Sequence, residues 1–209
     1  MKTKFDRRLF LGACALTAVG KLRAASFECS TRQSIAALVP QSGPWADEGA
    51  DMLRGISSAA KETGCAPSIS TYDTGNLSSR IPVAASRAVQ RENSTIVIGK
   101  LGVMTPLVAK QNPGALIVNL NSPIVPIVPN PSNAIAIPFD YFFELNPEKN
   151  KGSFGTQAFF STLVVLDTIR ESSDINTPEE LVTAMSNRTF SIPRGSIKLD
   201  KSSLTFSLI

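Results

Sequence analysis

The sequence predicts an α/β fold, a parallel doubly wound sheet in the strand order 2-1-3-4-5 with helices on both faces. Short apolar runs alternate along the chain with amphipathic segments whose apolar residues recur every three or four positions, as in successive βαβ units. The apolar runs are continuous, which is typical of strands that are buried on both faces. Clusters of Gly, Pro, Ser and Asn separate the segments and mark the turns.

The first unit sets the pattern. Residues 35–39 form an apolar run, and the turn at 40–44 leads into an amphipathic segment. Ser42 or Gly43 is expected to cap this helix, with a proline at its first position. Backbone N–H groups at the helix start would then offer a seat to an anion such as a carboxylate. An ordinary βα unit with a suitable cap is the alternative. The apolar face of the helix consists of Ala50, Leu53, Ile56 and Ala60.

The rest of the chain repeats this alternation. Further strands are expected at 68–73, 95–99, 115–120 and 133–139, and helices at 79–91, 105–111, 152–172 and 177–187. The last of these helices opens with a capping box from Thr177 to Glu180 and has a proline at its first position. Neither a G-x-G-x-x-G after the first strand nor a G-x-x-x-x-G-K-[ST] occurs, so no nucleotide cofactor is expected.

The composition excludes several classes of function. The net charge of +4 comes from residues 1–25, which carry six basic residues and one acidic residue, so the remainder is close to neutral. No nucleic-acid partner is therefore expected. The chain has no histidine, which removes Ser-His and Cys-His nucleophile pairs and most transition-metal sites. We expect no enzyme activity, no metal and no cofactor.

Residues 1–25 have the pattern of an export signal. A basic start precedes an apolar run at 9–20 that is too short to span a bilayer. The pair Arg7-Arg8 before Leu-Phe-Leu is similar to a twin-arginine motif, and an ordinary secretory signal is the alternative. The mature chain is then 26–209, periplasmic and without a transmembrane segment.

Two cysteines remain in the mature chain. Cys29 lies just before the first strand and Cys65 just after the first helix. In a right-handed βαβ unit these two points lie at the same edge of the sheet. Because the periplasm permits disulfides, we expect the pair to be bonded. Two unpaired buried thiols are the alternative.

Several motifs resemble one family. L-V-P-Q-S-G-P-W followed by A-D-M-L-R-G resembles the first βα unit of type I periplasmic binding proteins, in particular the branched-chain amino-acid-binding group of ABC-transporter receptors. V-I-G and L-I-V-N resemble the family's third and fourth strands, and residues 159–170 resemble its late helix. The resemblance implies a single lobe over 26–209. Its parts are core βα units at 26–139, a linker at 140–151 where the second lobe is missing, and returning helices with a terminal strand at 152–209.

The family's members are non-enzymatic and close two lobes over a small solute, so a single lobe implies half a site. In the predicted strand order, the loops after the first and third strands face one crevice. A carboxylate would sit there on two hydroxyls and nearby N–H groups, with an indole ring against its apolar part. The loop after V-I-G is L-G-V-M-T, which departs from the family's usual Ser or Ala-Ser/Thr. The candidate ligand-binding residues are Ser42, Gly43, Trp45, Gly102, Thr105 and Asn121.

Three classes of function follow. The first is a solute-binding component related to ABC transport, which takes a small carboxylate-bearing solute such as an amino acid. Its partners would be an ABC permease, another protein or a second copy of the chain. The second is a non-binding periplasmic interaction or assembly protein derived from a binding-protein lobe. The third, an enzyme, is disfavoured by the missing histidine.

Overall fold

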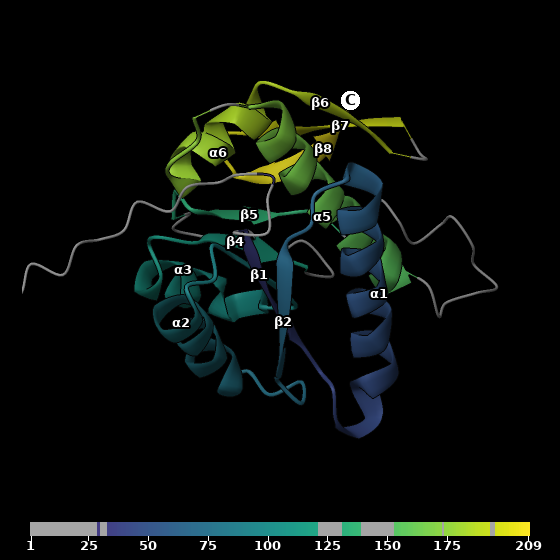
Figure 1. Cartoon of the computed structure of the whole chain (residues 1–209), viewed down its shortest axis with the longest axis vertical. Coiled ribbons are helices and arrows are strands. Elements are labelled where there is room, and N and C mark those ends of the chain that lie inside the picture. Colours follow the sequence, from purple (N-terminus) through teal and green to yellow (C-terminus); the bar gives the residue numbers. More distant parts are fainter. Residues whose placement is uncertain (1–28, 30–32, 121–130, 139–152, 173, 193–194) are drawn as a thin grey trace, which may run out of the picture.

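The structure is a computed structural model that describes residues 29, 33–120, 131–138, 153–172, 174–192 and 195–209. An eight-stranded sheet runs in the order β2-β1-β3-β4-β5-β8-β7-β6 (Figure 1). Its strands are β1 (Ser34–Val39), β2 (Ser68–Asp73), β3 (Ile96–Gly99), β4 (Leu116–Asn119), β5 (Ala134–Ala136), β6 (Thr189–Ile192), β7 (Gly195–Asp200) and β8 (Thr205–Leu208). The helices are α1 (Ala46–Thr63), α2 (Arg80–Glu92), α3 (Thr105–Gln111), α5 (Ser153–Glu171) and α6 (Pro178–Ser186), with 3-10 turns η1 (Gly43–Trp45) and η2 (Gly102–Met104).

The predicted order of the first five strands is confirmed, and neighbours among them pair in parallel. The expectation of a single terminal strand is wrong. β8 lies parallel to β5, and β7 and β6 then add antiparallel strands. Phe190 and Ile192 of β6 are buried while Thr189 and Ser191 are exposed. This alternation is typical of an antiparallel strand with one solvated face, so the end of the chain differs from the doubly buried strands before it.

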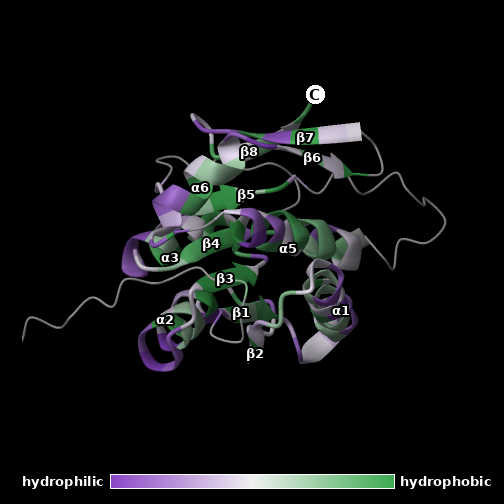
Figure 2. Ribbon diagram, turned by 45° about the horizontal axis from the view of Figure 1, so that its top comes forward, coloured by the Kyte–Doolittle hydropathy of each residue, from purple (hydrophilic) through white to green (hydrophobic). Residues whose placement is uncertain are grey.

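The central parallel strands are covered on both faces by helices (Figures 1 and 2). Ile35 and Ala37 belong to the core on the side of α1 and α5, whereas Ala36 and Leu38 belong to the core on the side of α2 and α3. Successive side chains of a strand point to opposite faces, so each apolar residue of β1 contributes to one of two cores. This explains why the strand reads as an unbroken apolar run.

α1 and α5 approach each other at glycines. A Cβ placed on Gly55 of α1 would lie 2.1 Å from the carbonyl oxygen of Gly155 in α5. A Cβ on Gly155 would in turn lie 2.9 Å from the carbonyl oxygen of Asp51. The close approach fixes the first turn of α5, including Phe154, beside the carboxyl ends of the central strands.

The predicted disulfide is confirmed, since Cys29 and Cys65 are joined with a Cα–Cα distance of 5.1 Å. The capping box of α6 is also confirmed, because the Thr177 hydroxyl oxygen accepts a hydrogen bond from the N–H of Glu180 and the Glu180 carboxylate accepts one from the N–H of Thr177. The predicted leader at 1–25 and the predicted linker at 140–151 lie outside the described residues. Within the described part of the chain, no helix is long and apolar enough to cross a bilayer.

Candidate functional site

The candidate crevice lies where β1 and β3 end. The two strands are neighbours in the sheet, and the chain leaves β1 toward α1 on one face and β3 toward α3 on the other. Such a divergence of connections opens a crevice at the carboxyl ends of parallel strands. The structure therefore brings the predicted loop residues Ser42, Gly43 and Trp45 to the same edge as Gly102 and Thr105. Asn121, the sixth predicted residue, lies outside the described residues.

The first loop is held by Asp73, at the end of β2. The Asp73 carboxylate accepts hydrogen bonds from Ser42 Oγ at 2.6 Å and from the N–H groups of Gln41 and Gly75 at 2.8 Å each. The Ser42 hydroxyl, followed by these two backbone groups, lowers the pKa of Asp73 to about 2. The hydroxyl and N–H that were predicted to hold a ligand's carboxylate thus already hold a carboxylate of the chain itself.

The prediction that Ser42 or Gly43 caps the following helix is wrong. The 3-10 turn η1, which begins at Gly43, separates Ser42 from α1. The cap position of α1 is occupied by Trp45. No side-chain hydrogen bond caps η1, because Ser42 donates to Asp73 instead. The turn is tight against α1, since a Cβ on Gly49 would lie 1.8 Å from the carbonyl oxygen of Pro40. This contact fixes the loop from which Trp45 projects.

The second loop is held by Asn119, at the end of β4. Asn119 Oδ1 accepts hydrogen bonds from the N–H groups of Leu101 at 3.0 Å and Gly102 at 3.1 Å. Thr105 is fully buried, and its hydroxyl donates to the carbonyl oxygen of Gly102 at 2.7 Å. Asn119 Nδ2 is buried and has no hydrogen-bond partner among the described residues. The N–H groups of Leu101 and Gly102 and the Thr105 hydroxyl are nevertheless occupied within the fold, as the Ser42 hydroxyl of the first loop is.

Four side chains meet at this edge of the sheet, one exposed and three partly buried. Lys100, the residue directly after β3, places its Nζ 4.2 Å from the ring centroid of Phe154 and 5.6 Å from that of Trp45. The same Nζ lies 3.0 Å from Glu48 Oε2. Trp45 is 44% exposed. We call Trp45, Glu48, Lys100 and Phe154 the Lys100 cluster.

The Lys100 cluster offers a ligand one positive charge and an apolar surface. An ammonium group near aromatic rings is stabilised by their electron-rich faces, and it remains available to a carboxylate that replaces Glu48. Of its four members, sequence reasoning found Trp45 alone. The position of Lys100 directly after an apolar strand was a usable signal. Phe154 gave none, because it reaches the crevice only through the packing of α5 on α1.

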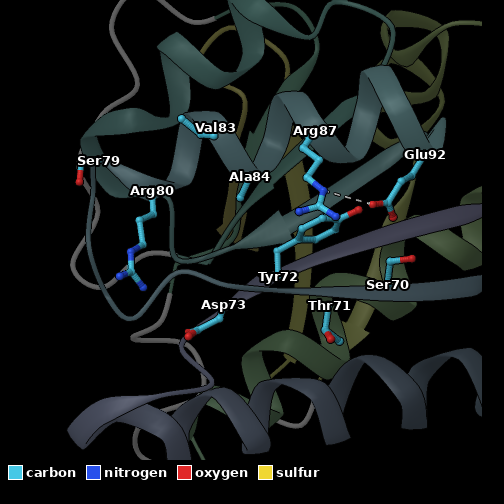
Figure 3. A pocket seen from close by; sticks show the side chains of 10 residues that line it. All are labelled: Ser70, Thr71, Tyr72, Asp73, Ser79, Arg80, Val83, Ala84, Arg87 and Glu92. Atoms are coloured by element: carbon cyan, nitrogen blue, oxygen red, sulfur yellow. Dashed lines mark ion pairs between the residues drawn. The ribbon is translucent and has the colours of Figure 1, made fainter.

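A cavity of about 820 Å³ lies elsewhere, between β2 and α2 (Figure 3). Its floor includes Tyr72, and burial raises the pKa of this phenol to about 12, with a further rise from Glu92 nearby. Arg87 lies 3.7 Å from Glu92, and Arg80 stands at the other end of α2. None of the predicted site residues lines this cavity. In the described residues, no group of His, Cys, Asp and Glu side chains is arranged to hold a metal ion.

No family model matches the sequence, and no curated protein does either. Solved structures of ABC transporter solute-binding proteins match the fold. One from R. palustris, in complex with 4-hydroxybenzoate, aligns with a TM-score of 0.66 at 11% identity, covering 84% of this chain and 90% of that chain. Another, from Rhodopseudomonas palustris BisB5 with 3,4-dihydroxybenzoic acid, gives 0.66 at 8% identity and covers 86% and 91%. A third, from Rhodopseudomonas palustris HaA2 with p-hydroxybenzoic acid, gives 0.67 at 10% identity and covers 84% and 90%.

Sequence identities of this size show the fold and do not show the ligand or the function. The chain has the fold of about one lobe of a type I periplasmic binding protein, with the parallel order β2-β1-β3-β4-β5 at its centre.

Proposed function

We propose that this chain is an exported, non-catalytic solute-binding component related to ABC transporter solute-binding proteins, and that it takes a small carboxylate-bearing solute. The observation that supports this is Lys100, whose ammonium lies between two aromatic rings at the carboxyl ends of β1 and β3. A cation beside an exposed indole suits a solute with one carboxylate and an apolar body. Hydroxybenzoates and apolar amino acids both have this form.

Binding at the Lys100 cluster requires an exchange of carboxylates. In the free chain Glu48 lies 3.0 Å from Lys100 Nζ and neutralises it. The carboxylate of the solute would replace Glu48, and its apolar part would cover the ring of Trp45. Because both partners of the Lys100–Glu48 pair are partly exposed, the pair adds little stability, and its exchange costs little.

The remaining predicted residues have a smaller part in the proposal. Ser42 can contribute only when its hydroxyl leaves Asp73, and Gly102 only when its N–H leaves Asn119. Thr105 is enclosed and shapes the loop from within. The contact of Asn121 with a ligand stays a prediction. Trp45 is therefore the predicted residue on which the proposal depends.

A single lobe leaves the solute open to water on one side, so affinity should be low, in the millimolar to high micromolar range, where each exposed polar contact adds little. A second protein that covers the crevice would raise it. An ABC permease in the inner membrane, reached from the periplasm, is the partner that this function implies.

Fluorescence gives a direct test, because Trp45 is the single tryptophan of the chain. The purified protein is titrated with 4-hydroxybenzoate, 3,4-dihydroxybenzoate, leucine and isoleucine. At least one should change the Trp45 emission with saturation. Lys100→Met should weaken that binding by roughly three- to tenfold, because it removes the charge and keeps most of the side-chain volume. Glu48→Gln should strengthen it, because the competing carboxylate is lost.

The matched control is Lys110→Met, an exposed lysine of α3 outside the cluster, which should leave the titration unchanged. If Lys100 only fastens β3 to α1, then Lys100→Met and Glu48→Gln should lower stability alike, and neither should alter a solute titration. A wild-type protein that responds to none of the four solutes at millimolar concentration contradicts the proposal.

A non-binding interaction protein is the second candidate. Trp45, Leu77 and Val103 come from the loops after β1, β2 and β3, and their side chains are 44%, 49% and 72% exposed. Three exposed apolar side chains at one edge of a sheet suit contact with another protein. Val103→Asp should then abolish capture of a periplasmic partner while the Trp45 titrations stay flat.

A further inference from the structure

The outer edge of β2 is open in the structure. β2 is the first strand of the sheet, and among the described residues no strand pairs with its other side. The N–H groups of Ser68 and Thr74 bond to Gln33 and Val39 on the β1 side. Because backbone groups alternate in direction along a strand, those of Ile69, Thr71 and Asp73 point away from β1. β2 contains neither the lysine nor the proline that commonly protect an edge strand.

The cavity beside this edge has an arginine and a carboxylate at each end, Arg80 with Asp73 and Arg87 with Glu92 (Figure 3). Arg80 lies near Asp73, at the carboxyl end of β2, and Glu92 lies near Ser70, at its amino end. Arg80 forms no ion pair with any described residue. Glu92 makes one long contact with Arg87, at 3.7 Å.

Between these ends the cavity is lined by Val83 and Ala84 of α2 and by Tyr72 of β2, and Val83 is 71% exposed. The open edge thus lies beside a groove with an arginine that has no ion pair among the described residues at one end and a loosely paired glutamate at the other.

We propose that two copies of this chain pair through their β2 strands. The two strands run antiparallel, about a two-fold axis that passes between Thr71 of one copy and Thr71 of the other. The three outward-facing residues are symmetric about Thr71, so Thr71 would face Thr71 of the second copy and Ile69 would face Asp73. Each of these facing pairs exchanges two backbone hydrogen bonds in an antiparallel ladder. The sheets of the two copies then continue into one another, and the open edge of each is closed.

The charges fit the same axis. A two-fold axis normal to the sheet keeps both copies of α2 on one face and reverses their direction. The Arg80 end of each groove therefore meets the Glu92 end of the other, and an ion pair forms twice. α2 packs mainly over β1, so the two helices lie about three strand spacings apart, roughly 14 Å. An arginine and a glutamate that extend toward each other bridge this distance, with Val83 of each copy between them.

A second copy suits the groove better than an acidic peptide does. The cavity is lined by two arginines and two carboxylates, Asp73 and Glu92, so its charges balance. An acidic peptide on the open edge would be repelled by these carboxylates. A second copy instead brings its Arg80 to Glu92 of the first.

The experiment is sedimentation velocity on the purified protein over a range of concentrations, with two pairs of variants. The wild type should change from monomer to dimer as concentration rises. Thr71→Pro removes an N–H that β1 does not use, so it should leave the monomer folded and raise the dimer dissociation constant about tenfold or more. Thr71→Val keeps the backbone N–H and should dimerise as the wild type does. Circular dichroism reports whether the proline variant stays folded.

The second pair tests the charges. Arg80→Glu or Glu92→Arg alone should weaken the dimer, and the double exchange should restore it. Thr71→Cys should form an intermolecular disulfide under mild oxidation, because facing residues of this kind lie about 5.5 Å apart between Cα atoms. A wild type that stays monomeric up to millimolar concentration overturns the proposal. So does a dimer that neither Thr71→Pro nor the charge variants weaken. Dimers that form only when an acidic peptide is added would show that the groove takes a peptide instead.

Discussion

The Asp73 carboxylate holds the first loop in place. It also takes up the Ser42 hydroxyl that a ligand's carboxylate would need. Three hydrogen bonds, from Ser42, Gln41 and Gly75, stabilise its charged form. The pKa of Asp73 is therefore about 2 in the folded chain, against about 3.9 in an unfolded one. Since the folded-state pKa is the lower one, the stabilisation is complete above pH 4 and is lost as the pH falls toward 2.

We predict that Asp73→Asn lowers the urea midpoint of unfolding at pH 7 and that its difference from the wild type shrinks between pH 4 and pH 2. The cause is that protonated Asp73 loses the same charge-assisted hydrogen bonds that the substitution removes. Asp174→Asn is the control, because it removes an exposed carboxylate that makes no such side-chain hydrogen bonds among the described residues. A gap between wild type and Asp73→Asn that stays constant down to pH 2 would rule out this account.

At this scale the sequence predicted the positions of two loops better than the contacts that hold them. The loops after β1 and β3 were located from turn residues and strand ends, and Trp45 lies in the first of them. The carboxylate that accepts from Ser42 and the amide oxygen that accepts from the N–H of Gly102 were missed. Asp73 and Asn119 each stand at the end of a neighbouring strand, so their contacts depend on strand register, which local sequence does not specify.

The packing of α1 on α5 is the element-scale feature that the site depends on most. Gly55 and Gly155 bring the two backbones close, and Phe154 reaches Lys100 only because of this. A side chain at either glycine would have to separate the helices. The same contact also joins the early and late parts of the chain.

We predict that Gly55→Ala lowers the free energy of unfolding by about 1–3 kcal/mol, because its Cβ would lie 2.1 Å from the backbone oxygen of Gly155 and α5 would have to move. Calorimetry or urea unfolding measures the loss. Gly114→Ala is the control, since nothing lies within 4 Å of a Cβ there, and it should stay within about 0.5 kcal/mol of the wild type. Equal stability of the two variants would contradict the predicted clash.

Element prediction succeeded where a local signal was strong. The buried strands β1, β3 and β4 and the capping box of α6 follow directly from apolar runs and cap residues. It failed at η1, where the proline starts a 3-10 turn rather than the α-helix, and at β6 to β8. The pairing of these three strands with one another and with β5 is set by tertiary contacts.

At the scale of the whole molecule, the disulfide between Cys29 and Cys65 contributes to the stability of the fold. The two cysteines are 36 positions apart, and a loop of that length corresponds to about 4 kcal/mol in the chain-entropy model. That contribution exists only in an oxidising compartment, so the chain would have it only after the predicted export.

The last prediction concerns this link between export and stability. Replacing Arg7 and Arg8 together by lysine should hold the precursor in the cytoplasm, because a twin-arginine signal requires the paired arginines whereas a general secretory signal needs only positive charge. The retained precursor should have reduced Cys29 and Cys65. Alkylation without reductant, followed by intact-mass measurement, should then modify three thiols in the retained variant, Cys14 of the leader together with Cys29 and Cys65, and none in the exported wild type. If the variant appears in the periplasm at the wild-type level, with its disulfide formed, the leader is an ordinary secretory signal.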